Sequence, residues 1–257
     1  MEMAIPKLRA PIVLVPGLVG LDHLRLGRWT VFSYFARLPQ TLAASGNRVL
    51  VPRMTFAGGI VQRATELKAF LDAHVPGEPV HILGHSMAGL DSRYMISHLD
   101  MASRVLSLTT IGTPHRGTTF ADWGTDRLAR VVRPMLDMLD LRHQGFLDVT
   151  TSNCRRFNEQ VPDAPTVRYF SVAGKHDADW RSLEWQLSHR IVHRHEGPND
   201  GVVSVASATY GESCEVWDAD HLELVNWPTV FARLSGRWRD RTTHYAGLIR
   251  RLADEGF

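Results

Sequence analysis

Short apolar runs alternate along the chain with segments whose apolar residues recur at helical spacing. The run at 11–15 is continuously apolar and rich in β-branched residues, which is typical of a strand buried on both faces of a sheet. From Val61 to Leu71 apolar residues return every three or four positions, which predicts a helix. The predicted strands are 11–15, 48–51, 80–83, 105–111, 167–173 and 214–217, and the predicted helices are 39–44, 60–74 and 87–98. This alternation predicts an α/β fold with a mostly parallel central sheet and helices on both faces.

The segment 118–160 breaks this rhythm. It holds more apolar residues than one helix packed on a sheet needs, mixed with several charges. We expect Pro134 to divide it into shorter helical pieces, because proline removes a backbone N–H and clashes with the preceding turn. The segment is predicted to be a helical insertion, either an ordinary packed excursion or a cap over a site.

Length and charge narrow the class of protein. A chain of 257 residues fits one α/β domain, and we predict a single domain over 1–257. Lys and Arg number 29 against 27 Asp and Glu, which gives a formal charge of +2 and argues against nucleic acid as a partner. The longest uncharged apolar run, 11–21, contains Pro16 and Gly17 and is too short to cross a bilayer, so no transmembrane segment is predicted.

The start of the chain and its two cysteines bear on the compartment. Residues 1–10 lack the long apolar segment of a signal peptide. A cytoplasmic protein is therefore expected, or a secreted one whose leader has been removed. Cys154 and Cys214 could form one bridge, but two inert thiols are the favoured interpretation.

The strongest candidate for chemistry is Gly84-His85-Ser86-Met87-Ala88-Gly89. It lies between a predicted strand and a predicted helix. A serine at such a sharp turn projects its hydroxyl above the edge of the sheet, and small residues around it let two backbones pass closely. If Ser86 only capped the helix, Gly84 and the small pair after Met87 would have no explanation. The pattern indicates a nucleophilic serine, although Ala88 stands where the motif usually has glycine.

A serine nucleophile needs a histidine base that is oriented by an acid, and on this architecture the chain order is Ser, acid, His. His221 follows the last predicted strand, from which it can fold back towards Ser86. For the acid, Asp200 in a turn before apolar residues is favoured, and Asp177, a few residues after an earlier strand, is the alternative. His85 and His115 are expected to shape the pocket.

Two backbone N–H groups are expected to bind the oxyanion of the reaction. One belongs to Met87, the residue after the nucleophile. The other is predicted at Leu18, because Gly17 allows a tight turn at the end of the first strand that can aim this N–H at the site.

With these motifs the chain resembles the bacterial triacylglycerol lipases of the Pseudomonas and Burkholderia type, which have the α/β-hydrolase fold. The matching segments follow the family order and are 13–22, 84–86, 112–117, 199–201 and 221–226. The resemblance implies Ser86, Asp200 and His221 as the catalytic triad, which supports Asp200 over Asp177. It also implies Leu18 and Met87 as oxyanion donors and 118–160 as the lid region.

The chain departs from that family at several positions. Pro16 stands where the family usually has histidine, and neither cysteine sits clearly at a family disulfide position. Those lipases often hold a structural Ca²⁺ through a carboxylate two residues after the catalytic histidine, and Glu223 occupies that position. The residue six after the histidine, often another ligand, is Trp227, and Asp177 or Asp179 could supply a distant carboxylate. The metal is therefore left open, with a solvated acidic loop favoured.

The sequence thus predicts a serine hydrolase for lipophilic acyl esters that forms an acyl-enzyme on Ser86. No organic cofactor is needed. The expected partner is a small lipophilic ester, with transient contact to lipid surfaces. Leu136 and Leu139 in the insertion are predicted to line the acyl-chain pocket. An acyltransferase or thioesterase with the same triad is the nearer alternative, and a non-catalytic binding protein on a hydrolase scaffold is a more distant one.

Overall fold

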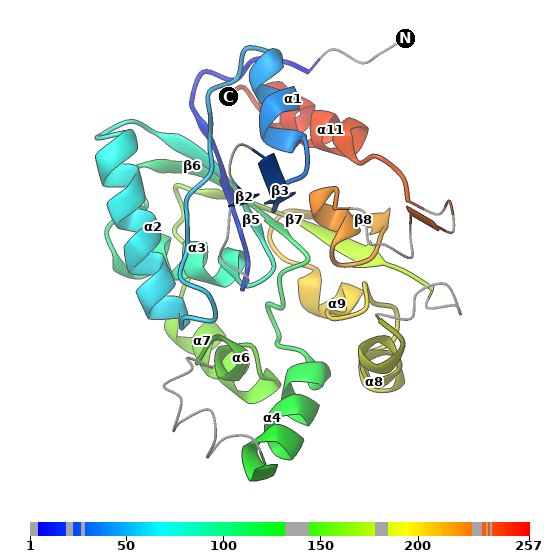
Figure 1. Cartoon of the computed structure of the whole chain (residues 1–257). Coiled ribbons are helices and arrows are strands. Elements are labelled where there is room, and N and C mark those ends of the chain that lie inside the picture. Colours follow the sequence, from blue (N-terminus) through cyan, green and yellow to red (C-terminus); the bar gives the residue numbers. More distant parts are fainter. Residues whose placement is uncertain are drawn as a thin grey trace.

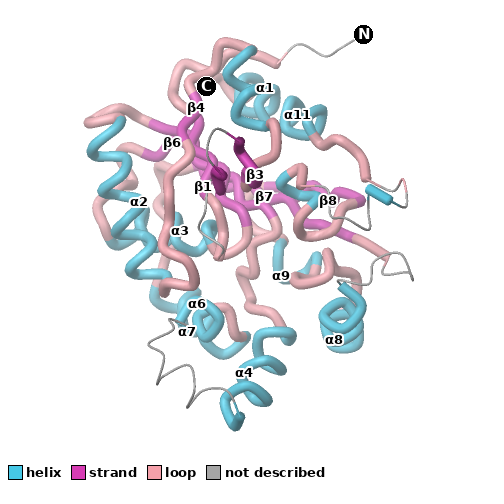
Figure 2. Tube along the Cα trace, in the orientation of Figure 1, coloured by secondary structure: helices cyan, strands magenta, loops and turns pink. Residues whose placement is uncertain are grey.

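The computed structural model describes residues 5–18, 23–26, 29–131, 144–177, 185–227, 233–234, 236 and 238–257. These residues form a six-stranded sheet through the middle of the molecule (Figures 1 and 2). In spatial order its strands are β4 (Val49–Leu50), β1 (Ile12–Val15), β5 (Val80–His85), β6 (Val105–Ile111), β7 (Arg168–Lys175) and β8 (Ser213–Asp218). Each neighbouring pair in this sheet is parallel, as the sequence predicts.

Helices cover both faces of the sheet, and side-chain alternation along β1 shows how. Ile12 and Leu14 point into the core that contains Leu38 of α1 (Leu38–Ala44) and Leu248 of α11 (Thr242–Asp254). The residues between and after them, Val13 and Val15, point into the opposite core. That core is built against α2 (Ile60–His74) and α3 (Ala88–His98). The prediction of helices on both faces is confirmed.

Two regions of regular structure were not predicted from the pattern. β2 (His23–Leu26) and β3 (Trp29–Ser33) form a separate antiparallel pair. Two further helices, α8 (Gln186–Glu196) and α9 (Val205–Ala208), fill the connection between β7 and β8, and a 3₁₀ turn, η2 (Glu223–Val225), follows β8.

The insertion after β6 is helical in its described parts. It contains α4 (Thr119–Val131), α6 (Gln144–Asp148) and α7 (Thr151–Gln160), which lie together beyond the end of the sheet in Figure 1. Its buried side chains, Ala121 and Phe157 among them, pack with Met87 and Leu90 at the start of α3. Part of the insertion is thus ordinary packing. Pro134, Leu136 and Leu139 lie outside the described residues.

None of the described helices combines the length and the apolar composition that crossing a membrane requires.

Candidate active site

Ser86 sits on a strained turn between β5 and α3, at the carboxyl edge of the sheet. Its φ of 56° is positive, which is unusual for a residue with a Cβ atom. The turn is held because the Ser86 N–H donates to the carbonyl of Ile111 at 2.8 Å and its carbonyl accepts from Thr113 Oγ1 at 2.7 Å. Both partners belong to β6 or to the loop after it. The hydroxyl is therefore aimed by the neighbouring strand as well as by its own.

The departure at Ala88 has a steric explanation. A Cβ atom at Gly84 would lie 3.1 Å from the backbone of Ala88 and Gly89, so the close approach of strand and helix needs glycine on the strand side. Ala88 is fully buried in the core under the sheet and its methyl group packs there. The turn therefore forms with alanine at that position.

The structure brings Ser86, His221 and Asp200 into hydrogen-bonding contact. His221 Nε2 lies 3.0 Å from Ser86 Oγ, and His221 Nδ1 lies 2.7 Å from Asp200 Oδ2. The other Asp200 oxygen, Oδ1, accepts from the N–H groups of Val202 and Val203 at 2.9 and 2.7 Å. Asp200 is 0% exposed, and its carbonyl also accepts the His221 N–H at 2.8 Å. This carboxylate is thus fixed in place and points at the imidazole.

The alternative acid, Asp177, is not part of this arrangement. It lies exposed just after β7, and it interacts electrostatically with His189 of α8. Of the two candidates, only Asp200 reaches His221.

The charge environment favours a protonated His221. Burial acts to lower the pKa of this imidazole, but the Asp200 carboxylate, the hydrogen bond that it accepts from Nδ1 and the nearby Asp220 carboxylate outweigh burial. The pKa of His221 is raised above its ordinary value. An imidazolium formed during a proton transfer would therefore be stabilised.

The predicted oxyanion donors also lie beside Ser86. A Cβ at Gly17 would come within 2.8 Å of both Ser86 Cβ and the Tyr34 hydroxyl, so only glycine lets this loop pass over the nucleophile. The next residue, Leu18, is anchored through its carbonyl, which accepts the Ala57 N–H at 3.0 Å. Met87 begins the first turn of α3. The two loops that carry the predicted N–H donors thus meet at the serine.

A hydrogen-bonded chain that sequence reasoning missed links the Gly17 loop to His221. The Gly17 N–H donates to Tyr34 Oη at 2.9 Å, and Tyr34 Oη lies 2.7 Å from His85 Nδ1. His85 Nε2 lies 3.0 Å from the His221 carbonyl, which can only accept. His85 therefore carries its proton on Nε2 and accepts the Tyr34 hydroxyl proton on Nδ1.

The side chains of this hydrogen-bonded network are uncharged at neutral pH. Burial, and then the adjacent His221 ring, hold the pKa of His85 well below its ordinary range, and burial raises the pKa of Tyr34. Every donor in the chain meets an acceptor. These hydrogen bonds connect the Gly17 loop over Ser86 to the backbone of His221, the candidate base.

Comparison with known proteins bears on the family. No family model matches the chain. A triacylglycerol lipase of Pseudarthrobacter phenanthrenivorans is 35% identical over 85% of this chain and 89% of that protein. A triacylglycerol lipase of Burkholderia plantarii is also 35% identical, over 85% of this chain and 79% of that protein. The chain belongs to the triacylglycerol lipase family. Triacylglycerol lipase 2 of Saccharomyces cerevisiae is 32% identical over 76% of this chain, which spans only 62% of the yeast protein.

Solved structures agree with the lipase family in fold. A Bacillus licheniformis lipase, BlEst2 in mature form, superposes with a TM-score of 0.67 at 21% identity over 88% of this chain and 91% of that chain. Staphylococcus hyicus lipase superposes with a TM-score of 0.71 at 16% identity, over 100% of this chain and 100% of that chain. The predicted α/β-hydrolase fold and the predicted class, carboxylic ester hydrolase, are confirmed.

A buried ion pair, also missed by sequence reasoning, lies next to the loop that carries Leu18. Arg63 of α2 donates from Nε to Asp91 Oδ2 of α3 at 2.7 Å, and both side chains are fully buried. Its other nitrogens donate to the carbonyls of Pro16 and Thr55 at 2.7 and 2.8 Å. Arg63 thus ties α3 to the loop that carries Leu18. The available signal was an arginine on the apolar face of a predicted helix.

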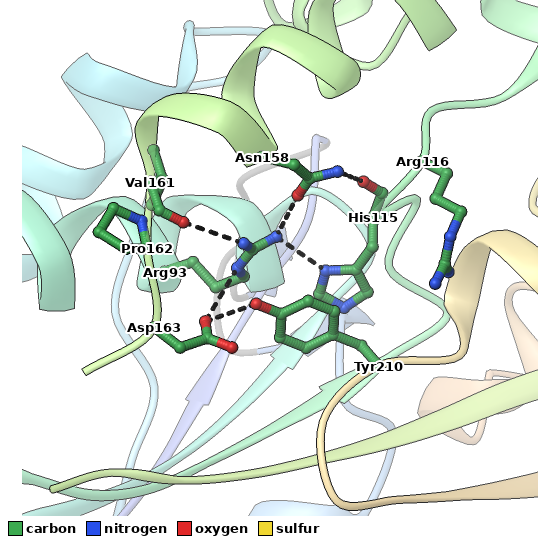
Figure 3. A pocket seen from close by; sticks show the side chains of 8 residues that line it. All are labelled: Arg93, His115, Arg116, Asn158, Val161, Pro162, Asp163 and Tyr210. Atoms are coloured by element: carbon green, nitrogen blue, oxygen red, sulfur yellow. Dashed lines mark hydrogen bonds and ion pairs between the residues drawn. The ribbon is translucent and has the colours of Figure 1, made fainter. Parts of the chain in front are cut away.

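His115 lines a cavity whose lining residues do not include Ser86, Asp200 or His221. The volume of this cavity is about 300 Å³, and Figure 3 shows His115 stacked beside Tyr210 and next to Arg93. Arg93 is buried there and donates to Asn158 Oδ1 at 2.8 Å and to the Val161 carbonyl at 3.2 Å. This cluster joins α3 to the end of α7. A role for His115 in the pocket of the nucleophile stays a prediction.

The cysteines take no part in the site. Both are free, and Cys154 is buried where burial and then the Asp148 carboxylate raise the pKa of its thiol to about 12. That thiol stays protonated and unreactive.

Proposed function

We propose that the chain hydrolyses lipophilic carboxylic esters through an acyl-enzyme on Ser86. The observation that carries this proposal is the unbroken contact from Ser86 Oγ to His221 Nε2 at 3.0 Å and from His221 Nδ1 to Asp200 at 2.7 Å. Such a constellation activates a hydroxyl that is otherwise a poor nucleophile. Its placement at the carboxyl edge of the sheet suits a site open to substrate.

In the first half-reaction, Ser86 Oγ attacks the ester carbonyl carbon while His221 Nε2 takes the hydroxyl proton. Asp200 holds the imidazole in the required tautomer and stabilises the imidazolium. The tetrahedral intermediate collapses when His221 gives the proton to the alcohol oxygen and the C–O bond breaks. In the second half, His221 takes a proton from water, which attacks the acyl-enzyme and releases the acid and free Ser86.

The oxyanion of both intermediates is assigned to the backbone N–H groups of Leu18 and Met87. Support comes from Gly17, which lets the first loop pass against Ser86, and from Arg63, which holds the Pro16 carbonyl at 2.7 Å. Prepositioned donors of this kind stabilise charge without reorganising during the reaction.

Contact with a lipid surface is assigned to exposed apolar side chains near the loop that carries Leu18. Phe56 and Phe146 are 61% and 51% exposed, and Val61 is exposed as well. Their segments are bonded together, since the Gly145 N–H donates to the Ala57 carbonyl at 3.1 Å. Exposed apolar groups gathered at one place are typical of interaction surfaces.

The pH dependence follows from the raised pKa of His221. The imidazole must be neutral to accept the Ser86 proton, so activity is present above its pKa and is lost as pH falls through it. We expect the acidic limb of kcat/KM to have its midpoint above the ordinary histidine value of about 6.5. A limb centred at or below that value would contradict the environment described for His221.

Removing the Tyr34 hydroxyl is expected to lower kcat. Tyr34→Phe breaks the link between Gly17 and His85, and a loss of about tenfold is expected, less than the roughly 10²–10³-fold loss of an oxyanion donor itself. The control is Tyr169→Phe, which loses a buried hydroxyl bonded to the Ala164 N–H at 3.1 Å, away from the site. Equal rates in the two variants would show that the Tyr34 bridge has no effect on turnover.

The segment 118–160 is assigned as the cap, with Leu136 and Leu139 lining the acyl pocket. We expect Leu136→Asp or Leu139→Asp to weaken turnover of long-chain esters more than that of acetate esters. A longer chain buries more apolar surface, at about 0.8 kcal/mol per CH₂. Equal losses on both substrates, in a folded variant, would make this part of the segment structural packing.

The proposed function is tested with p-nitrophenyl esters of increasing acyl length, run beside Ser86→Ala. Hydrolysis that requires Ser86 and rises with chain length supports it. Transfer of the acyl group to an alcohol or thiol in preference to water would favour the acyltransferase alternative.

A further inference from the structure

The loop that carries His221, here residues 219–226 and called the His221 loop, contains a buried carboxylate. Glu223 lies in the 3₁₀ turn η2 and is only 2% exposed. A buried carboxylate needs a compensating charge close to it. Glu223 occupies the position where the resemblance implies a ligand of structural Ca²⁺, two residues after the base.

The compensating charge in this chain is Arg241. Its side chain is buried, and Nη2 lies 3.2 Å from Glu223 Oε2. The same nitrogen donates to the carbonyl of Asp218, the last residue of β8. One guanidinium thus joins the end of β8 to the middle of the His221 loop.

Arg241 is itself held firmly against that loop. Its N–H donates to Asn226 Oδ1 at 2.8 Å, and its carbonyl accepts N–H groups at the first turn of α11. From that helix, Tyr245 Oη donates to the Leu224 carbonyl at 2.9 Å. The start of α11 therefore contacts the His221 loop through the Arg241–Glu223 ion pair and through two neutral hydrogen bonds, to Asn226 and Leu224.

These residues do not fit a calcium site. Oxygen ligands around Ca²⁺ number six to eight, and a guanidinium at this distance both occupies a Glu223 oxygen and repels a dication. Trp227, six residues after His221, has no side-chain oxygen. Within the described ranges no three His, Cys, Asp or Glu side chains are grouped to hold a metal.

We propose that Arg241 performs for the His221 loop the task that a structural Ca²⁺ performs in relatives of this type. It is a positioning residue that keeps His221 within reach of Ser86 and makes the loop independent of metal. The proposal rests on the proposed function only in naming His221 as the base. Its effect on loop stability can be measured without turnover.

The first test uses the wild-type protein and needs no substrate. The thermal unfolding midpoint is measured after dialysis against EDTA and again after Ca²⁺ is added in millimolar excess. No shift in either step is expected. A fall with EDTA that Ca²⁺ reverses would overturn the proposal.

The second test compares Arg241→Met, Arg241→Lys and the control Arg251→Met. Arg251 is an arginine of α11 that pairs with Glu215 of β8 but does not touch the His221 loop. Arg241→Met is expected to lower kcat roughly 10²-fold with KM little changed, because small displacements of a catalytic group have effects of this size. Arg241→Lys should recover part of the loss, and Arg251→Met should resemble wild type.

The readouts separate positioning from general damage. The rate of fluorophosphonate labelling of Ser86 should fall with kcat in Arg241→Met, and methylguanidinium added to Arg241→Ala should restore it in part. Wild-type labelling and kcat in Arg241→Met would overturn the proposal, as would equal losses in Arg251→Met. If Arg241→Met does not fold, the EDTA result and methylguanidinium rescue of Arg241→Ala decide. Full activity in Ser86→Ala would instead overturn the proposed function and leave the EDTA result standing.

Discussion

Replacing Ser86 with alanine will lower kcat for ester hydrolysis roughly 10⁶-fold, the loss seen when the nucleophile of a serine triad is removed. His221 Nε2, 3.0 Å from Ser86 Oγ, would then have no hydroxyl to deprotonate. The remaining rate would come from substrate binding and the oxyanion donors alone. The measurement is kcat on a soluble ester, with enzyme concentration taken from absorbance and thermal unfolding as the check on folding.

The variant should remain folded. Serine and alanine both carry a Cβ, so the strain at a φ of 56° is the same in both. The matched control is Ser92→Ala on α3, the helix that follows Ser86, where the hydroxyl donates to the Ala88 carbonyl at 2.7 Å. Its kcat should stay close to wild type. A folded Ser86→Ala enzyme with near-normal turnover would show that another residue is the nucleophile.

Asp200→Asn is expected to lower kcat roughly 10⁴-fold, because an amide no longer holds the His221 tautomer that can accept a proton. The 2.7 Å contact to Nδ1 and the two N–H groups of Val202 and Val203 place this carboxylate for that role. The measurement is kcat for the same ester, with thermal unfolding as the check on folding.

Asp177→Asn is the control for that change, since Asp177 is exposed and the carboxylate bonded to His221 Nδ1 is that of Asp200. Its kcat should resemble that of wild type. A larger loss in Asp177→Asn than in Asp200→Asn would mean that the wrong acid has been assigned.

Much of the fold could be predicted because burial imposes periodicity on the sequence. The helix 60–74 and the strand 105–111 have the predicted bounds, since each presents an apolar face or run to one core. Ser86 could be predicted as a candidate from its turn, because the small residues around it have a local steric cause. Asp200 and His221 followed from chain order and from their place after predicted elements.

The missed features depend on contacts between distant segments. Tyr34 acts through His85, 51 residues away, and Arg63 through Asp91, 28 residues away. An arginine in a helix looks solvated until its partner is known, and the same holds for Arg241. β2 and β3 are four and five residues long, too short for alternation to stand out.

The central claim is that the substrate acylates Ser86, and one measurement tests it most directly. The wild-type protein is reacted with a stoichiometric fluorophosphonate, and the modified residue is located by peptide mass spectrometry. The account predicts a single adduct on Ser86, formed faster as pH rises through the pKa of His221. No adduct, or one on another side chain, would contradict it.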